Sequence, residues 1–162
     1  ILSASTGLAC AVRTADCVPI LIADRRSGAV AAVHAGWRGV VGSVIECALR
    51  ELARSQSEAP EWVAAIGPHI SRAAFEVSDE VAHQLQQASP DPGVVDRSRA
   101  RPHVDLRRIV RAKLLALGVE ASWIDDVDGC TVSDARQFFS FRRDGAQSGR
   151  HLSAIVARGR QT

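Results

Sequence analysis

A predicted β-hairpin near the start of the chain is the feature that most constrains the fold. Two apolar stretches, 20–23 and 29–33, are separated by the polar segment 24–28. Short apolar runs joined by a polar, glycine-containing turn are typical of two antiparallel strands. Such a hairpin brings the residues before its first strand next to those that follow its second strand. The sequence therefore predicts that segments 14–19 and 34–39 lie close together.

Each of these two segments carries a side chain that is capable of chemistry. Cys17 lies in the first segment and His34 opens the second. A thiol and an imidazole brought together form either a nucleophile–base pair or two ligands of a soft metal site. Pro19 indicates a strand start or edge, because proline cannot donate to a central ladder. Asp16 either orients a ligand or caps a turn. The purely structural alternatives are a buried thiol and a hydrogen-bonded histidine at a strand end.

The rest of the chain mixes strand and helix patterns. Helical apolar spacing covers 40–54, 78–88 and 105–117, with Ser78 and Asp105 as N-caps and Gly118 as a stop. Strands are predicted at 7–13, 61–66, 121–124 and 152–157, and a loop at 89–102. At 162 residues the chain is expected to form a single domain over 1–162. The predicted fold class is α/β or α+β, a mixed-sheet sandwich with helices packed on the sheet.

Composition excludes several classes of protein. The net charge of +2 gives no basic footprint for nucleic acid, and no apolar run approaches the roughly 18 residues of a membrane helix. Four cysteines without close pairing and the lack of a signal peptide predict a cytoplasmic protein. We expect a monomer or a small homo-oligomer. Because the chain opens at Ile1 and contains no Met, further sequence is expected upstream.

Five ordered motifs, at 14–19, 34–39, 66–70, 75–77 and 139–145, together resemble the YfiH family. This family is also called laccase-domain protein, multicopper polyphenol oxidase or purine nucleoside phosphorylase. The resemblance runs from about residue 7 to about residue 156. It implies an α/β sandwich that holds one zinc ion through two histidines and one cysteine. It also implies cytoplasmic phosphorolysis of adenosine, inosine, guanosine and methylthioadenosine, with some adenosine deamination.

Carried over residue by residue, the resemblance makes Cys17 and His34 catalytic residues and two of the three zinc ligands. The third ligand, a histidine in a Gln-x-His motif, has no match in this sequence and is expected upstream of Ile1. His69 stands where many members carry a cysteine, and no ligand role is assigned to it.

Two arginines are candidates for binding substrate or phosphate. Arg38 lies at a predicted strand-to-helix turn between Gly36 and Gly39, where backbone amides and a guanidinium are available to an anion. Its alternative is a surface ion pair. Arg143 follows three phenylalanines within 138–141, which suggests a ring stacked on a purine and a guanidinium on phosphate. The alternative is phenylalanine packing beside a solvated face.

The number of potential metal ligands in the sequence favours zinc over copper. A blue-copper centre uses two histidines, a cysteine and usually a methionine, and a laccase cluster needs many more histidines. Five scattered histidines and no methionine do not furnish that set. His83 and His103 are expected to be solvated, and the acidic residues of 125–128 to form a solvated turn. Rival functions are a metal-free Cys/His hydrolase or amidase acting on peptidoglycan precursors, polyphenol oxidation with copper, and a non-catalytic binding protein.

Overall fold

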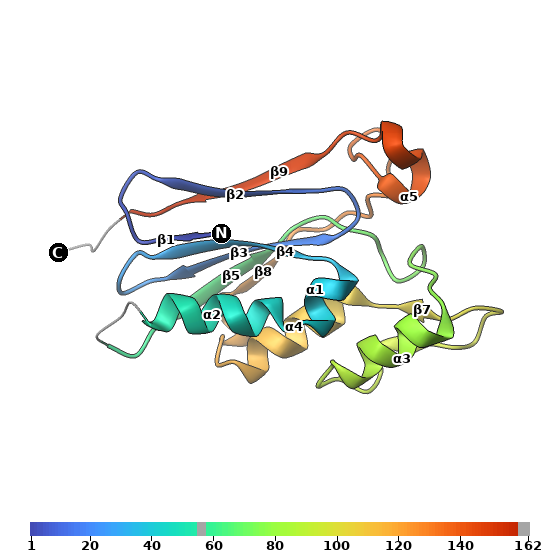
Figure 1. The fold of residues 1–162 in the computed structure, drawn as a ribbon, viewed down its shortest axis with the longest axis horizontal. Helices are drawn as coiled ribbons and strands as arrows, with labels where there is room; N and C mark the ends of the chain where they lie inside the picture. Colours follow the sequence, from blue (N-terminus) through green and yellow to red (C-terminus); the bar gives the residue numbers. More distant parts are fainter. Residues whose placement is uncertain (55–57, 159–162) are drawn as a thin grey trace.

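The computed structural model describes residues 1–54 and 58–158, which form a layered arrangement of strands and helices (Figure 1). The strands are β1 (Leu2–Ser3), β2 (Ala9–Thr14), β3 (Val18–Asp24), β4 (Val30–Ala35), β5 (Trp62–Ile66), β6 (Val95–Asp96), β7 (His103–Val104), β8 (Ile124–Asp126) and β9 (His151–Val156). The helices are α1 (Trp37–Val41), α2 (Val44–Arg54), α3 (Asp79–Gln87), α4 (Leu106–Ala116) and α5 (Phe141–Asp144), with short 3-10 turns at η1 (Ala121–Trp123) and η2 (Gly145–Gln147).

The central sheet has five strands in the order β1-β4-β3-β5-β8. The predicted hairpin is confirmed, because β3 and β4 pair antiparallel and Pro19 lies opposite His34. β5 is antiparallel to β3, whereas β8 is parallel to β5. The start of β3 therefore meets the ends of β4, β5 and β8 at one edge of the sheet. The loops that follow these three strands converge there.

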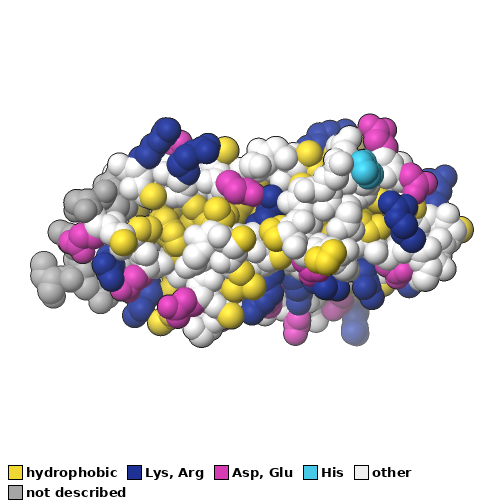
Figure 2. Space-filling view, turned by 90° about the horizontal axis from the view of Figure 1, so that it is seen from below, with side chains coloured by type: hydrophobic (Ala, Val, Ile, Leu, Met, Phe, Trp, Pro, Cys, Tyr) yellow, Lys and Arg dark blue, Asp and Glu magenta, His cyan; other side chains and the backbone are white. Residues whose placement is uncertain are grey.

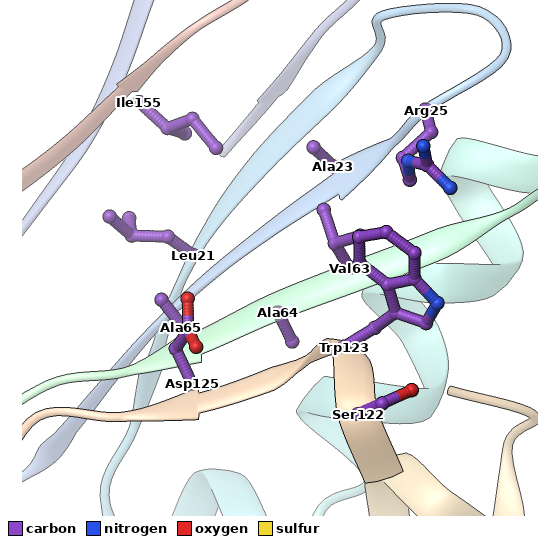
Figure 3. A pocket seen from close by; sticks show the side chains of 10 residues that line it. All are labelled: Leu21, Ala23, Arg25, Val63, Ala64, Ala65, Ser122, Trp123, Asp125 and Ile155. Atoms are coloured by element: carbon purple, nitrogen blue, oxygen red, sulfur yellow. The ribbon is translucent and has the colours of Figure 1, made fainter. Parts of the chain in front are cut away.

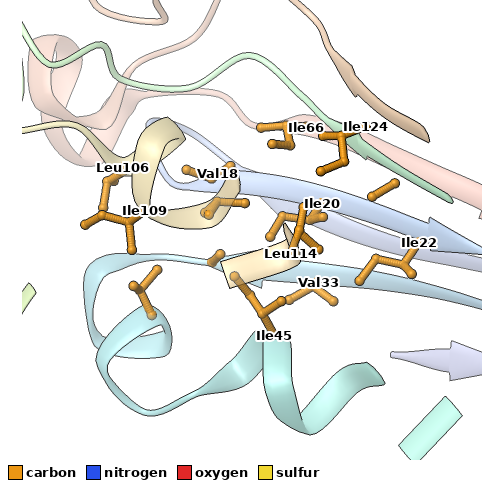
Figure 4. Packing of buried hydrophobic residues seen from close by; sticks show 14 of the residues in the cluster. Val18, Ile20, Ile22, Val33, Ile45, Ile66, Leu106, Ile109, Leu114 and Ile124 are labelled. Carbon is orange, nitrogen blue, oxygen red and sulfur yellow. The ribbon is translucent and has the colours of Figure 1, made fainter. Parts of the chain in front are cut away.

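The main core lies between the sheet and the helices α2 and α4 (Figures 1 and 4). Along β3 the residues Val18, Ile20 and Ile22 have no exposed surface, because alternate side chains of a strand point to one face. Ile45 of α2 and Leu114 of α4 pack against them from below (Figure 4). Burial of this apolar surface fixes the sheet, and with it the edge at which β3 begins.

A two-stranded ribbon of β2 and β9 covers the opposite face of the sheet (Figure 1). The pairing runs from Ala9 opposite Val156 to Thr14 opposite His151. A small second core of Cys10, Val12, Val30, Ala32 and Ala157 joins ribbon to sheet. The mixed α/β sandwich predicted from the sequence is thus confirmed.

Three local predictions need correction. The helix predicted over 40–54 is broken after α1, because Ser43 adopts a left-handed conformation with φ of 58°. The strand predicted at 121–124 begins only at Ile124, after the 3-10 turn, and continues into the acidic segment, where Asp126 pairs with Arg111 at 2.9 Å. The predicted loop 89–102 contains β6, which pairs with β7. This pairing makes His103 a buried residue rather than a solvated one.

The face that carries the helices shows acidic and basic side chains interspersed among apolar ones (Figure 2). Neither charge dominates that view, in keeping with the small net charge of the chain. Among the helices of the described residues, none has the length and hydrophobicity needed to cross a bilayer.

Candidate active site at the sheet edge

The structure brings Cys17 and His34 to one point at the edge of the sheet, beside Gly36. A Cβ atom placed on Gly36 would lie 2.9 Å from Cys17 Sγ and 3.8 Å from His34 Nε2. Both donor atoms therefore face the small space that the missing side chain of Gly36 leaves open. The β3–β4 register produces this arrangement, since Cys17 precedes β3 directly and His34 is the penultimate residue of β4. The predicted proximity of the two residues is confirmed.

The surroundings of Cys17 disfavour its thiolate form. Burial, followed by the nearby Asp16 carboxylate, raises the pKa of the Cys17 thiol, and the charge of Arg150 only partly opposes this. Without a metal the thiol is thus protonated at neutral pH, whereas the attacking form of a cysteine is the thiolate. Among the described residues, no hydrogen bond joins Cys17 to His34. A bound cation would stabilise the thiolate that burial disfavours.

Asp16 ties the segment before β3 to three other parts of the chain. Its backbone has a φ of 85°, a left-handed conformation that is uncommon for residues other than glycine. The buried carboxylate accepts hydrogen bonds of 2.6 Å from Thr131 Oγ1 and from the backbone N–H of Arg142. Its carbonyl accepts a third bond from the N–H of Ile70. The carboxylate bonds run to residues distant in the sequence and not to the turn of Asp16 itself, so they hold the segment that carries Cys17 rather than cap that turn.

Arg38 is exposed and its guanidinium stacks over the Trp37 ring, 4.4 Å from the ring centroid. No carboxylate within the described residues pairs with Arg38, so the structure does not show the surface ion pair weighed as its alternative. The guanidinium therefore keeps its hydrogen-bond donors available to an anion. The turn that carries it starts at Gly36, one residue before α1.

Arg143 is placed differently, because its guanidinium is already occupied within the protein. It donates to the carbonyls of Thr131, Val132 and Phe138 and forms an ion pair of 2.8 Å with Asp144. This geometry favours a role in positioning the loop 131–138 over direct phosphate binding. The nearby phenylalanine rings do not form a core, because Phe139 and Phe141 are 50% and 52% exposed.

Sequence reasoning missed Arg150 as a residue of the site. Its positive charge lies close enough to Cys17 to lower the pKa of that thiol, and its guanidinium lies over the Phe141 ring at 5.5 Å. One of its amino groups donates to the carbonyls of Ser148 and Gly149. No local pattern marks Arg150, because it reaches Cys17 only through the pairing of β9 with β2.

The donor chemistry of the pair fits zinc in part. Thiolate sulfur and imidazole nitrogen are the ligands that zinc prefers. Across residues 1–54 and 58–158, however, no three His, Cys, Asp or Glu side chains gather closely enough to hold a metal ion. The described residues therefore provide two donor atoms that face a common space, fewer than the three protein ligands of a catalytic zinc site.

Among the cavities that neither Cys17 nor His34 lines, two are of interest. One of about 480 Å³ lies on the sheet face opposite the helices, where the apolar side chains Leu21, Val63 and Ile155 and the stacked pair Arg25–Trp123 line it (Figure 3). The other, of about 390 Å³, is lined by His69 and Cys130 together with polar residues of the loop after β5 and of the start of α4.

Comparison with known proteins gives several extended matches. An adenosine deaminase, RL5, from an unknown prokaryotic organism is 40% identical over 152 residues, which are 92% of this chain and 58% of that protein. A purine nucleoside phosphorylase from Bacteroides thetaiotaomicron is 38% identical over 154 residues, covering 93% of this chain and 57% of its own. A purine nucleoside phosphorylase named YfiH from Shigella flexneri is 37% identical, covering 94% of this chain and 61% of its own.

The fold matches equally well. The crystal structure of YlmD from Geobacillus stearothermophilus superposes with a TM-score of 0.87 at 32% identity, over 97% of this chain and 60% of that protein. The chain thus spans about three fifths of the length of the relatives that it matches. The family model for multi-copper polyphenol oxidoreductase laccase covers residues 1–158, and the chain therefore belongs to this family, the YfiH family indicated by its sequence motifs.

Proposed function

We propose that the protein is a zinc-dependent purine nucleoside phosphorylase that acts on adenosine, inosine, guanosine and methylthioadenosine, with adenosine deamination as a side activity. The observation that carries this proposal is the convergence of Cys17 Sγ and His34 Nε2 beside Gly36. The names of the relatives, purine nucleoside phosphorylase and adenosine deaminase, support a role in nucleoside processing.

In this proposal Cys17 and His34 hold the zinc ion, with a third ligand from outside the described residues. When bound, zinc supplies Lewis acidity and lowers the pKa of a coordinated water, which is the chemistry that deamination needs. Gly36 leaves the space that the two donor atoms face. Asp16 positions Cys17 through its bonds to Thr131 and the backbone of Arg142.

Phosphorolysis joins a phosphate oxygen to the anomeric carbon of the ribose and breaks the bond from that carbon to the purine nitrogen. The products are ribose 1-phosphate and the free base, which takes up a proton. In this proposal Arg38, whose donors meet no acceptor among the described residues, neutralises phosphate charge as the bond forms. Arg150 adds a second positive charge near Cys17. The exposed ring of Phe141, below Arg150, offers a surface on which a purine can stack.

The test is phosphate-dependent release of base from inosine and adenosine by the full-length protein, with zinc content measured in parallel. Cys17→Ala is compared with Cys10→Ala, since Cys10 lies in the small core between β2 and the sheet. We expect Cys17→Ala to lose both zinc and base release, and Cys10→Ala to retain both. Base release that continues without phosphate or survives in the Cys17→Ala variant would overturn the proposal.

Alkylation of Cys17 distinguishes the proposed zinc enzyme from a metal-free hydrolase. A nucleophilic Cys17 would be blocked by iodoacetamide with no change in metal content, whereas alkylation of a ligand releases zinc. The raised pKa of Cys17 and the lack of a hydrogen bond to His34 make the second result the expected one.

A further inference from the structure

The cavity lined by Cys130 and His69 has a chemistry of its own, apart from the Cys17–His34 pair. Its volume is about 390 Å³, and its polar lining residues are His69, Ser71, Arg72, Asp105, Arg107 and Cys130. These residues come from the loops after β5 and β8 and from the start of α4. An isolated parallel bridge between His69 and Cys130 places both residues on one wall.

The sulfur of Cys130 lies among hydrogen-bond donors. The backbone N–H of Ser71 points to Sγ at 3.4 Å. Burial alone would raise the pKa of the Cys130 thiol, but the donors of Ser133 and Ser71 outweigh it and lower this pKa to about 7. Cys130 is half-buried and borders the cavity, so a small molecule can reach its sulfur.

His69 independently indicates that the cavity takes a polar ligand. The side chain is only 3% exposed, and its Nδ1 lies 2.8 Å from the carbonyl of Gly67. Burial lowers the pKa of His69, an effect that the bond to Gly67 opposes and the charge of Arg107 reinforces, so the ring is neutral at pH 7. Within the described residues Nε2 has no hydrogen-bond partner. It is therefore an acceptor available to an N–H group of a ligand.

Two arginines and one carboxylate line the cavity. Arg72 is exposed and forms no ion pair within the described part of the chain, although its charge also acts on the Asp96 carboxylate. Arg107 is already paired with Asp128 at 2.9 Å, and one carboxylate oxygen of Asp105 caps α4 through the N–H of Arg108. Arg72 is consequently the cation of this wall that a carboxylate from outside can engage.

We propose that Cys130 is a site of thiol–disulfide exchange with small peptide disulfides, whose carboxylate binds Arg72 and whose N–H group donates to His69. The Cys130 thiolate attacks one sulfur of the disulfide R–S–S–R. The R–S–S–R bond breaks, a Cys130–S–S–R bond forms, and R–S⁻ leaves and takes a proton from water. The peptide disulfide is the only oxidant that the step requires.

The lowered pKa sets the size of the expected effect. At pH 7 such a thiol is about half ionised, against about 1% for a thiol at the ordinary value of 9.0. Because a thiolate of lower pKa is also a weaker nucleophile, the net advantage at pH 7 is about five-fold. The contact between Arg72 and the carboxylate of the disulfide is partly solvated. We expect its removal to slow the reaction of an anionic disulfide about two- to five-fold.

The test incubates the full-length protein at pH 7 with oxidised glutathione, with the neutral 2-hydroxyethyl disulfide and with the cationic cystamine. Adducts on each cysteine are timed by peptide mass mapping. We expect glutathione to modify Cys130 faster than the other cysteines, and Arg72→Gln to lower that rate without slowing the 2-hydroxyethyl disulfide. Because the adducts are mapped on the unmutated chain, the test does not need a variant that lacks Cys130 and does not depend on the folding of such a variant.

Preferential modification of Cys47 or Cys17 would overturn the proposal. Equal rates for the anionic and cationic disulfides, or an unchanged glutathione rate in Arg72→Gln, would also overturn it. None of these measurements involves a nucleoside or zinc, so their outcome is separate from that of the proposed phosphorylase.

Discussion

The substitution Gly36→Ala offers a direct test of the Cys17–His34 site. Gly36 has φ of −75° and ψ of 168°, a conformation that alanine adopts without strain. The added methyl group would nevertheless lie 2.9 Å from Cys17 Sγ and 3.8 Å from His34 Nε2. The effect of this substitution is therefore confined to the space that the two donor atoms share.

The size of the effect follows from contact distances. Non-bonded heavy atoms are at their best separation at about 3.5–4.0 Å, so Cys17 Sγ must move by about 0.6–1 Å to accommodate the methyl group. Metal–ligand distances tolerate about 0.2 Å. We expect zinc affinity to fall by about ten- to a hundred-fold, or about 1.4–2.8 kcal/mol.

Zinc affinity is measured by competition with a chromogenic chelator, and folding by urea denaturation of the metal-free protein. Gly39→Ala is the matched control, because a Cβ at Gly39 meets Val44 and the carbonyl of His34 and neither donor atom. Its zinc affinity should equal that of the wild type. If Gly36→Ala also binds zinc as the wild type does, the two side chains do not hold a metal in this space, and the reasoning fails.

Three further predictions concern stability. Lys113→Met leaves the partly buried Glu46 carboxylate without the Lys113 Nζ that lies 2.5 Å from it, and should lower the free energy of unfolding by about 3–5 kcal/mol. Urea denaturation should show most of this loss recovered when Glu46→Leu is added, and an unchanged single variant would contradict the argument. Burial opposes ionisation of Asp24. Hydrogen bonds from the Ser27 hydroxyl and from the backbone N–H groups of Ser27, Glu61 and Arg26 outweigh this effect and lower the Asp24 pKa below its usual value of 3.8. This contribution is present above about pH 4 and is lost as pH falls through the folded pKa, so melting temperatures of Asp24→Asn should depend less on pH between pH 5 and 2 than those of the wild type. Arg143→Gln removes donors to three carbonyls of the loop 131–138, so limited proteolysis should cut that loop faster; an unchanged rate would argue against a positioning role.

Local sequence patterns determined the parts of the molecule that depend on neighbouring residues. The β3–β4 hairpin follows from two apolar runs and one polar turn, and it suffices to bring Cys17 close to His34. The N-caps were equally predictable, because the Ser78 and Asp105 side chains accept hydrogen bonds from residues three positions on. In each case the interacting groups are fixed by short-range geometry alone.

Only the tertiary structure decided how distant segments share the site. Arg150 reaches Cys17 because β9 pairs with β2, and Thr131 reaches Asp16 because the loop after β8 lies beside the start of β3. Arg143, predicted from its motif to bind phosphate, has its donors turned toward carbonyls of the protein. Sequence periodicity reports which face of an element is buried, but it carries no information on which other element covers that face. Contacts across more than a hundred residues depend on the packing of the whole sheet, and the assignment of charges around Cys17 depends on those contacts.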